Sequence, residues 1–140
     1  MTSKGLIAIV AGMAVAFAIA LPAAFGASNA TVVSVTAGKP SELRFTLSKK
    51  TSAKGVVTFK VTNKGALEHD FKIDGKVTKK LEPGTSATLR VTFKKGGKFP
   101  FLNLPPGQSG AIIFDQPGAY SYICTYHAQD MQGMVIVVAR

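Results

Sequence analysis

The sequence predicts an all-β domain, an antiparallel Greek-key sandwich or barrel that follows an N-terminal export signal. Three observations predict it. From Thr31 onward, short runs rich in β-branched and aromatic residues recur roughly every ten residues. Turn-forming stretches such as Asn63-Lys64-Gly65, Asp74-Gly75 and Pro83-Gly84 separate these runs. No amphipathic helical pattern of useful length follows residue 30, so layers of strands must form the core.

The first 30 residues have the pattern of a secretory signal peptide. Lys4 precedes an apolar run from Leu6 to Leu21, and small or turn-forming residues follow this run. Cleavage after Gly26 or after Ala30 fits the pattern equally well. An uncleaved membrane anchor is the alternative, because the apolar stretch is about long enough to cross a bilayer. We therefore expect a periplasmic or extracellular protein whose folded domain spans residues 31–140.

Nine strands are expected in the exported part. They span Thr31–Thr36, Glu42–Ser48, Gly55–Thr62, His69–Ile73, Thr85–Phe93, Lys98–Phe101, Gly110–Phe114, Gly118–Cys124 and Met134–Val138. Within this pattern, residues 81–103 align with residues 104–124, which indicates a duplicated hairpin whose first copy lacks the cysteine. The alternative is that two Pro-Gly-led hairpins match through turn chemistry alone.

The exported part is strongly basic. Without the signal it keeps 16 of the 17 basic residues against all 7 acidic ones, a net charge of +9. Lysines on the solvated faces and edges of strands explain this in structural terms. The functional alternative is electrostatic steering toward an acidic partner or an anionic membrane surface. Nucleic acid is not an expected partner, because the chain is exported and has neither a nucleic-acid motif nor an arginine cluster.

The residues with distinctive chemistry gather near the C-terminus. Cys124 is the only cysteine, so it cannot form an intramolecular disulfide. His127 and Met131 follow it in a short loop between two predicted strands, and His69 is the only other histidine. An electron-transfer copper site uses two imidazoles, one thiolate and a weak axial donor such as methionine. The chain offers candidates for every role, with Met134 as a second methionine near the loop.

The segment YSYICTYHAQDMQGMVIVV resembles the cysteine–histidine loop and final strand of the cupredoxins, the small blue-copper proteins. Upstream, VVTFKVTNKGALEHDFKI is similar to the strand that delivers their first histidine, and the resemblance covers nearly all of residues 31–140. It implies an eight-stranded Greek-key fold with one type 1 copper ion. Carried over residue by residue, it makes His69, Cys124 and His127 equatorial ligands and Met131 the axial ligand.

Three departures from the family pattern stand out. Asp70 occupies a position where many members have asparagine, and its ionised side chain can only accept hydrogen bonds. Tyr126 replaces a proline often found before the loop histidine, which restores a backbone N–H. Both changes are expected to act on the reduction potential through hydrogen bonds around the ligands. The extra hairpin at residues 81–103 is the third departure.

We expect a monomeric electron carrier that docks weakly on redox proteins, acidic or membrane-bound ones. A copper chaperone or storage protein of the same fold is the main alternative. Enzymes on this fold need a further copper site rich in histidine, and no histidine remains once His69 and His127 are used. A Cys124–His127 nucleophilic pair lacks an orienting third group. A metal-free adhesion-type sandwich and a zinc site complete the alternatives, although an axial thioether is no reason to expect zinc.

Overall fold

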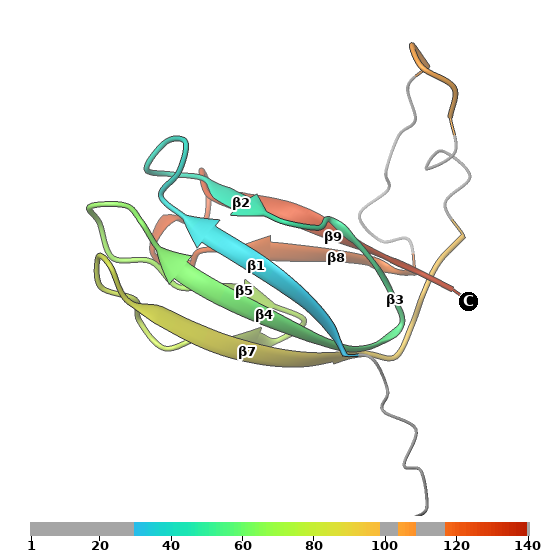
Figure 1. Cartoon of the computed structure of the whole chain (residues 1–140), viewed down its shortest axis with the longest axis horizontal. Coiled ribbons are helices and arrows are strands. Elements are labelled where there is room, and N and C mark those ends of the chain that lie inside the picture. Colours follow the sequence, from blue (N-terminus) through green and yellow to red (C-terminus); the bar gives the residue numbers. More distant parts are fainter. Residues whose placement is uncertain (1–29, 99–103, 109–116, 140) are drawn as a thin grey trace, which may run out of the picture.

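The computed structural model describes residues 30–98, 104–108 and 117–139. Two sheets pack face to face (Figure 1). The first sheet has the order β2-β1-β4-β7, with β1 at Thr31–Ala37, β2 at Phe45–Leu47, β4 at Gly55–Asn63 and β7 at Ser86–Phe93. The second has the order β3-β9-β8-β5-β6, with β3 at Thr51–Ala53, β5 at Lys72–Ile73, β6 at Lys76–Val77, β8 at Ala119–Ile123 and β9 at Gln132–Val138. The predicted β-sandwich is thus confirmed.

Two strand pairs are parallel, whereas the sequence predicted antiparallel pairing. β1 pairs with β4 in parallel from Thr31↔Val57 to Ala37↔Asn63, and β3 pairs with β9 in parallel. The chain leaves the first sheet after β2, adds β3 to the second sheet, and returns at Gly55 to begin β4 beside β1 (Figure 1). Gly55 has a φ of 126°, a backbone conformation that residues other than glycine rarely adopt.

The strand boundaries differ from the predicted ones in a few places. β3 and β6 were not predicted, and β9 begins two residues before Met134. In the segment predicted as His69–Ile73, only Lys72 and Ile73 form a ladder, and His69 makes an isolated bridge to Leu81. The signal segment, nearly all of the strands predicted at Lys98–Phe101 and Gly110–Phe114, and parts of both copies of the proposed duplication lie outside the described residues.

The core lies between the sheets and follows the alternation of the strands. In β4, Val57, Phe59 and Val61 are fully buried while their neighbours face outward. Phe71 stands edge-on to Phe45, with ring centroids 5.2 Å apart, and its ring is fully buried. Burying such a ring stabilises the fold by about 1.5–3 kcal/mol. Because Phe71 is two residues from His69, the core also fixes the segment that carries the first candidate ligand.

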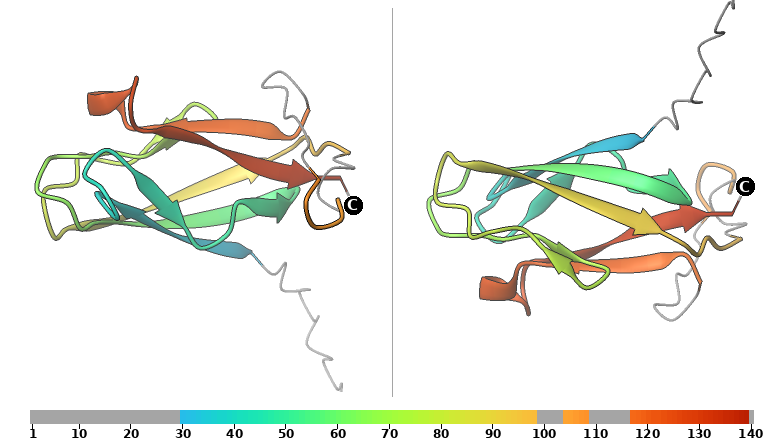
Figure 2. Two further views of the ribbon diagram at one scale, coloured as in Figure 1. Left: turned by 90° about the horizontal axis from the view of Figure 1, so that it is seen from above. Right: turned by 90° about the horizontal axis from the view of Figure 1, so that it is seen from below.

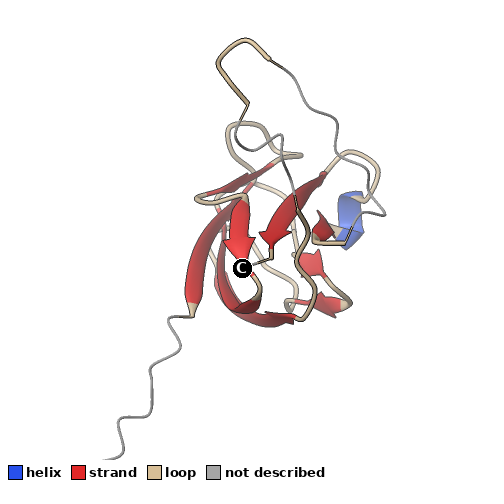
Figure 3. Cartoon of the chain, turned by 90° about the vertical axis from the view of Figure 1, so that its right-hand side faces the viewer, coloured by secondary structure: helices blue, strands red, loops and turns tan. Residues whose placement is uncertain are grey.

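The connections after β1, β4 and β8 gather at the end of the sandwich opposite the C-terminus (Figure 2). The connection after β8 contains the short 3₁₀ helix η2 at Thr125–His127. This single turn is the helical element in the described part of the chain (Figure 3). Among the described residues, no helix is long and apolar enough to cross a membrane.

Candidate metal centre

His69 is fixed by backbone hydrogen bonds and by a buried amide before it. Its N–H donates to the carbonyl of Leu81 at 3.1 Å, and the N–H of Leu81 donates back at 2.7 Å. Asn63, fully buried, donates from Nδ2 to the carbonyls of Leu67 and Leu81 and accepts from the N–H of Gly65. The turn predicted at Asn63-Lys64-Gly65 is therefore held by the Asn63 side chain. His69 itself is fully buried.

The loop from Cys124 to Met131 is closed by its own backbone. The N–H of Cys124 donates to the carbonyl of Met131 at 2.9 Å, and the N–H of Met131 donates to the carbonyl of His127 at 2.9 Å. Cys124 and Met131 are fully buried, while His127 is half-buried. The loop thus brings a thiol, an imidazole and a thioether together at the end of β8.

The three donor atoms of His69, Cys124 and His127 converge. All of them lie within 4.8 Å of one another. Cys124 Sγ is 3.7 Å from His69 Nδ1 and 3.6 Å from His127 Nδ1. Donors of these types bind transition metals at about 2.0–2.3 Å, so an imidazole and a thiolate at ~120° around one ion would be roughly 3.5–3.8 Å apart. The observed spacing fits a metal ion in a trigonal site.

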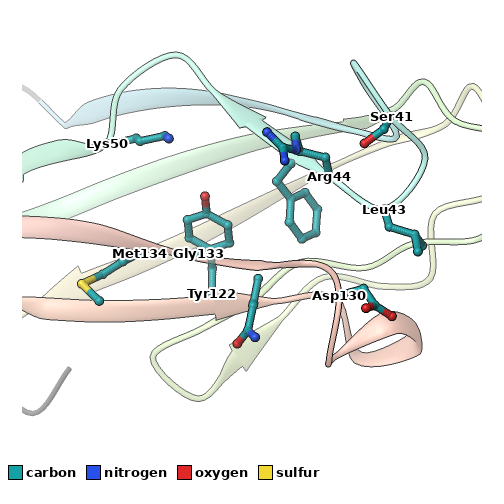
Figure 4. Close-up of a pocket in the computed structure, with 10 residues that line it drawn as sticks. Ser41, Leu43, Arg44, Lys50, Tyr122, Asp130, Gly133 and Met134 are labelled. Atoms are coloured by element: carbon teal, nitrogen blue, oxygen red, sulfur yellow. The ribbon is translucent and has the colours of Figure 1, made fainter. Parts of the chain in front are cut away.

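The two methionines near the loop have different environments. Met131 is fully buried on the loop that carries Cys124 and His127. Met134 is half-buried on β9 and lines a groove of about 360 Å³ beside β2 and β9. Figure 4 shows Met134 and Asp130 at opposite ends of this groove, with Tyr122 between them. The position of Met134 on the strand favours Met131 as the thioether available to the centre.

Asp70 links the two segments that carry the candidate ligands. Its Oδ1 accepts a hydrogen bond from the backbone N–H of Thr125 at 2.6 Å, and its Oδ2 accepts from the Thr125 hydroxyl. Asp70 follows His69 and Thr125 follows Cys124, so this pair of hydrogen bonds fixes the two candidate ligands relative to each other. The expectation that the residue at this position acts only as an acceptor agrees with both bonds.

Burial and hydrogen bonding act in opposite directions on the pKa of the Cys124 thiol. Burial raises its pKa, and hydrogen bonds from the backbone N–H groups of Asp70, Tyr126 and His127 partly offset this effect. Tyr126, at the position where many cupredoxins have proline, supplies one of these N–H groups. A metal ion would replace the thiol proton and take up the charge of the thiolate, which the buried site otherwise disfavours.

Glu42 is a site residue that sequence reasoning missed. It precedes β2, and its Oε1 is 3.0 Å from Nε2 of His69. Hydrogen bonds from the backbone N–H of Ala66 and then of Leu67 lower the pKa of Glu42 to about 2, with a smaller contribution from His69. The contact joins residues 27 positions apart, and no local motif marks Glu42 as a partner of His69.

The fold and the donor set define a small β-sandwich protein with a thiolate–imidazole metal centre. A family model described as copper binding proteins, plastocyanin/azurin family, matches residues 31–138. The chain therefore belongs to the plastocyanin/azurin family of copper-binding proteins. The cofactor expected from the sequence, one type 1 copper ion, agrees with this family and with the donor set.

Comparison with solved structures gives matches at low sequence identity, of which auracyanin A shares the fold. Auracyanin A, a blue copper protein from the green thermophilic photosynthetic bacterium Chloroflexus aurantiacus, gives a TM-score of 0.52 at 16% identity, covering 79% of this chain and 98% of that one. Reduced auracyanin from Roseiflexus castenholzii gives a TM-score of 0.48 at 18% identity, covering 77% and 96%. No curated protein sequence matches the chain.

Proposed function

We propose that the protein is an exported carrier of single electrons, with one copper ion held by His69, Cys124, His127 and, axially, Met131. The observation that carries this proposal is the convergence of three donor atoms within 4.8 Å in a largely buried site. Bound copper would supply a one-electron Cu(II)/Cu(I) couple.

The protein's part is to keep its ligands where they are in both oxidation states. The Asp70–Thr125 link and the backbone bonds of His69 and Cys124 hold the donors from several directions. Little rearrangement is then needed when the charge of the centre changes, which favours fast electron transfer.

Electrons are proposed to pass through the half-buried ring of His127. Exposed apolar side chains lie on the connections at this end of the sandwich: Tyr126 is 50% exposed, Leu67 47% and Leu43 37%. A small apolar face around an accessible ligand suits short-lived docking between redox proteins. The basic surface would steer acidic or membrane-bound partners toward the protein, which we propose acts as a monomer.

Export and the domain boundary at residue 31 rest on the sequence pattern of the N-terminal segment. We propose a periplasmic or extracellular location, with membrane attachment if that segment stays uncleaved. A catalytic role is disfavoured, because the whole chain contains two histidines and both are assigned to the electron-transfer site.

Adding Cu(II) to the purified protein tests the proposal directly. We expect an intense visible band from thiolate-to-copper charge transfer, because a deprotonated Cys124 would be a copper ligand. Cys124→Ser is the matched control. It should remain a folded β protein without the band, since a hydroxyl cannot supply this transition. A colourless wild-type protein would rule out the carrier, and a coloured Cys124→Ser variant would remove Cys124 from the ligand set.

A copper chaperone or storage protein remains the second candidate, because it could use the same donors. Voltammetry separates the two functions. A carrier gives a reversible one-electron couple at constant copper content, whereas a chaperone releases copper to a competing acceptor during the cycle. Only Met131 and Met134 lie near the loop, and sites that exchange copper readily use more methionines, which favours the carrier.

A further inference from the structure

The imidazole of His69 has a carboxylate on the side opposite Cys124. Glu42 Oε1 is 3.0 Å from His69 Nε2, while His69 Nδ1 is 3.7 Å from Cys124 Sγ. A carboxylate can only accept, so in this pair Nε2 carries the ring proton. The lone pair of Nδ1 is then directed toward Cys124 Sγ, 3.7 Å away. The contact therefore selects the one neutral tautomer that can bind a metal beside Cys124.

The Glu42 carboxylate is itself fixed by the next loop. Oε1 accepts from the N–H of Leu67 at 2.8 Å, and both oxygens accept from the N–H of Ala66, at 3.0 and 2.9 Å. Glu42 thus uses backbone donors of the connection between β4 and His69 to hold its position. Its side chain is one-third exposed, but the imidazole that it contacts is fully buried.

Two glycines make room for this arrangement. A Cβ on Gly65 would lie 2.2 Å from Glu42 Oε1, and a Cβ on Gly38 would lie 2.4 Å from the Cα of Gly65. The loop that carries Glu42 and the loop that leads to His69 therefore approach backbone to backbone. Any larger residue at Gly65 would push the carboxylate away from the ring.

We propose that Glu42 is the positioning residue of His69, fixing its tautomer and ring orientation and tuning the metal that it binds. The second half of this inference rests on the proposed copper centre, while the first concerns the metal-free protein. A carboxylate–histidine–metal chain raises the basicity of the imidazole. The negative charge beside His69 also favours Cu(II) over Cu(I), so Glu42 lowers the reduction potential.

The first experiment uses the metal-free protein. The ¹⁵N shifts of the His69 ring report which nitrogen carries the proton. We expect a single Nε2-protonated form in the wild type and a mixture of tautomers in Glu42→Ala. Glu42→Gln keeps an oxygen that can accept from Nε2, so it should restore most of the wild-type pattern. An unchanged tautomer in a folded Glu42→Ala protein would overturn the proposal.

The second experiment uses the copper-loaded protein, with Glu68→Gln as the matched control. Glu68 is adjacent to His69 in the chain, but its carboxylate pairs with Lys80 at 2.7 Å. We expect Glu42→Ala to weaken Cu(II) binding by about 10–100-fold. Glu42→Gln should recover most of that affinity, yet still raise the reduction potential because the charge is gone. Glu68→Gln should leave affinity and potential close to the wild type.

Equal shifts in Glu42→Gln and Glu68→Gln would overturn the proposal, because the effect would then be one of charge at a distance. If Glu42→Ala gives a mixture of tautomers and the wild type shows the copper band, the results support both the positioning role of Glu42 and the copper centre. A wild-type protein without the band would contradict the proposed function, while the tautomer measurement would still decide the role of Glu42.

Discussion

Met131 and Met134 are three residues apart, yet the structure gives them different surroundings. Met131 is fully buried within the ligand loop, and Met134 lines the groove beside β2. We predict that Met131→Leu raises the reduction potential, because losing a weak donor disfavours Cu(II). The substitution conserves volume, so the free energy of unfolding should fall by no more than about 1.5 kcal/mol.

Met134→Leu is the matched control for this prediction. It should leave the potential nearly unchanged, since the side chain faces the groove. Voltammetry on both variants, with urea unfolding for stability, checks both statements. A larger potential shift in Met134→Leu would move the axial ligand three residues along the chain.

The candidate ligands could be recognised from single residues, because Cys124 is the only cysteine and the chain has only two histidines. The residues that hold these candidate ligands in place could not be recognised in the same way. Asn63 was predicted as a turn residue. The hydrogen bonds from its side-chain amide to the carbonyls of Leu67 and Leu81 depend on how two loops meet, which the sequence does not show. Glu42 contacts His69 across 27 positions, a relation that no local pattern encodes.

At the level of elements, β8 and β9 pack tightly at Gly133. Tyr122 is opposite Gly133 in the antiparallel ladder, and a Cβ on Gly133 would lie 2.3 Å from the Tyr122 hydroxyl oxygen. The Tyr122 ring is held by Phe45 and Phe71, with ring centroids 5.7 and 5.3 Å away. Gly133 has no positive φ, so space rather than backbone conformation requires glycine here.

We therefore predict that Gly133→Ala lowers the free energy of unfolding by about 1–3 kcal/mol, the usual cost of overpacking. Urea denaturation followed by circular dichroism measures it. In a Tyr122→Ala background the same substitution should cost little, because the ring that the new methyl group meets is absent. A Gly133→Ala protein as stable as the wild type would show that the ring can move aside freely.

The elements with strong patterns were predicted more accurately than the short ones. β4 and β7 alternate clearly over eight or nine residues, and their predicted bounds agree within a residue. β3, β5 and β6 have two or three residues each, too few for alternation to be visible. The parallel pairing of β1 with β4 arises because the chain passes from the second sheet back to the first at Gly55. The positions of strands along the sequence do not reveal such a change of sheet.

At the scale of the whole molecule, charge should govern how fast partners meet. Residues 31–140 carry a net charge of +9, so electron transfer to an acidic redox protein should slow as salt rises. Transfer to a basic redox protein should become faster, because the repulsion is screened. Stopped-flow rates measured between low and high ionic strength check this prediction.

A small neutral oxidant provides the control for the salt series, since its rate should hardly depend on ionic strength. Rates that are insensitive to salt with both protein partners would mean that the lysines serve only to keep the surface solvated. The sandwich as a whole was predictable because turns and alternating runs recur along the chain. The same pattern does not identify the redox partner.

The complete burial of Cys124 has a practical consequence for the metal-free protein. Because this is the only sulfhydryl in the chain, a thiol reagent can modify the protein at a single place. Modification requires the region around Cys124 to open first, so its rate reports how often that opening occurs. Repeating the measurement in dilute urea then distinguishes a local fluctuation of the loop, which is insensitive to denaturant, from unfolding of the entire sandwich, which is not.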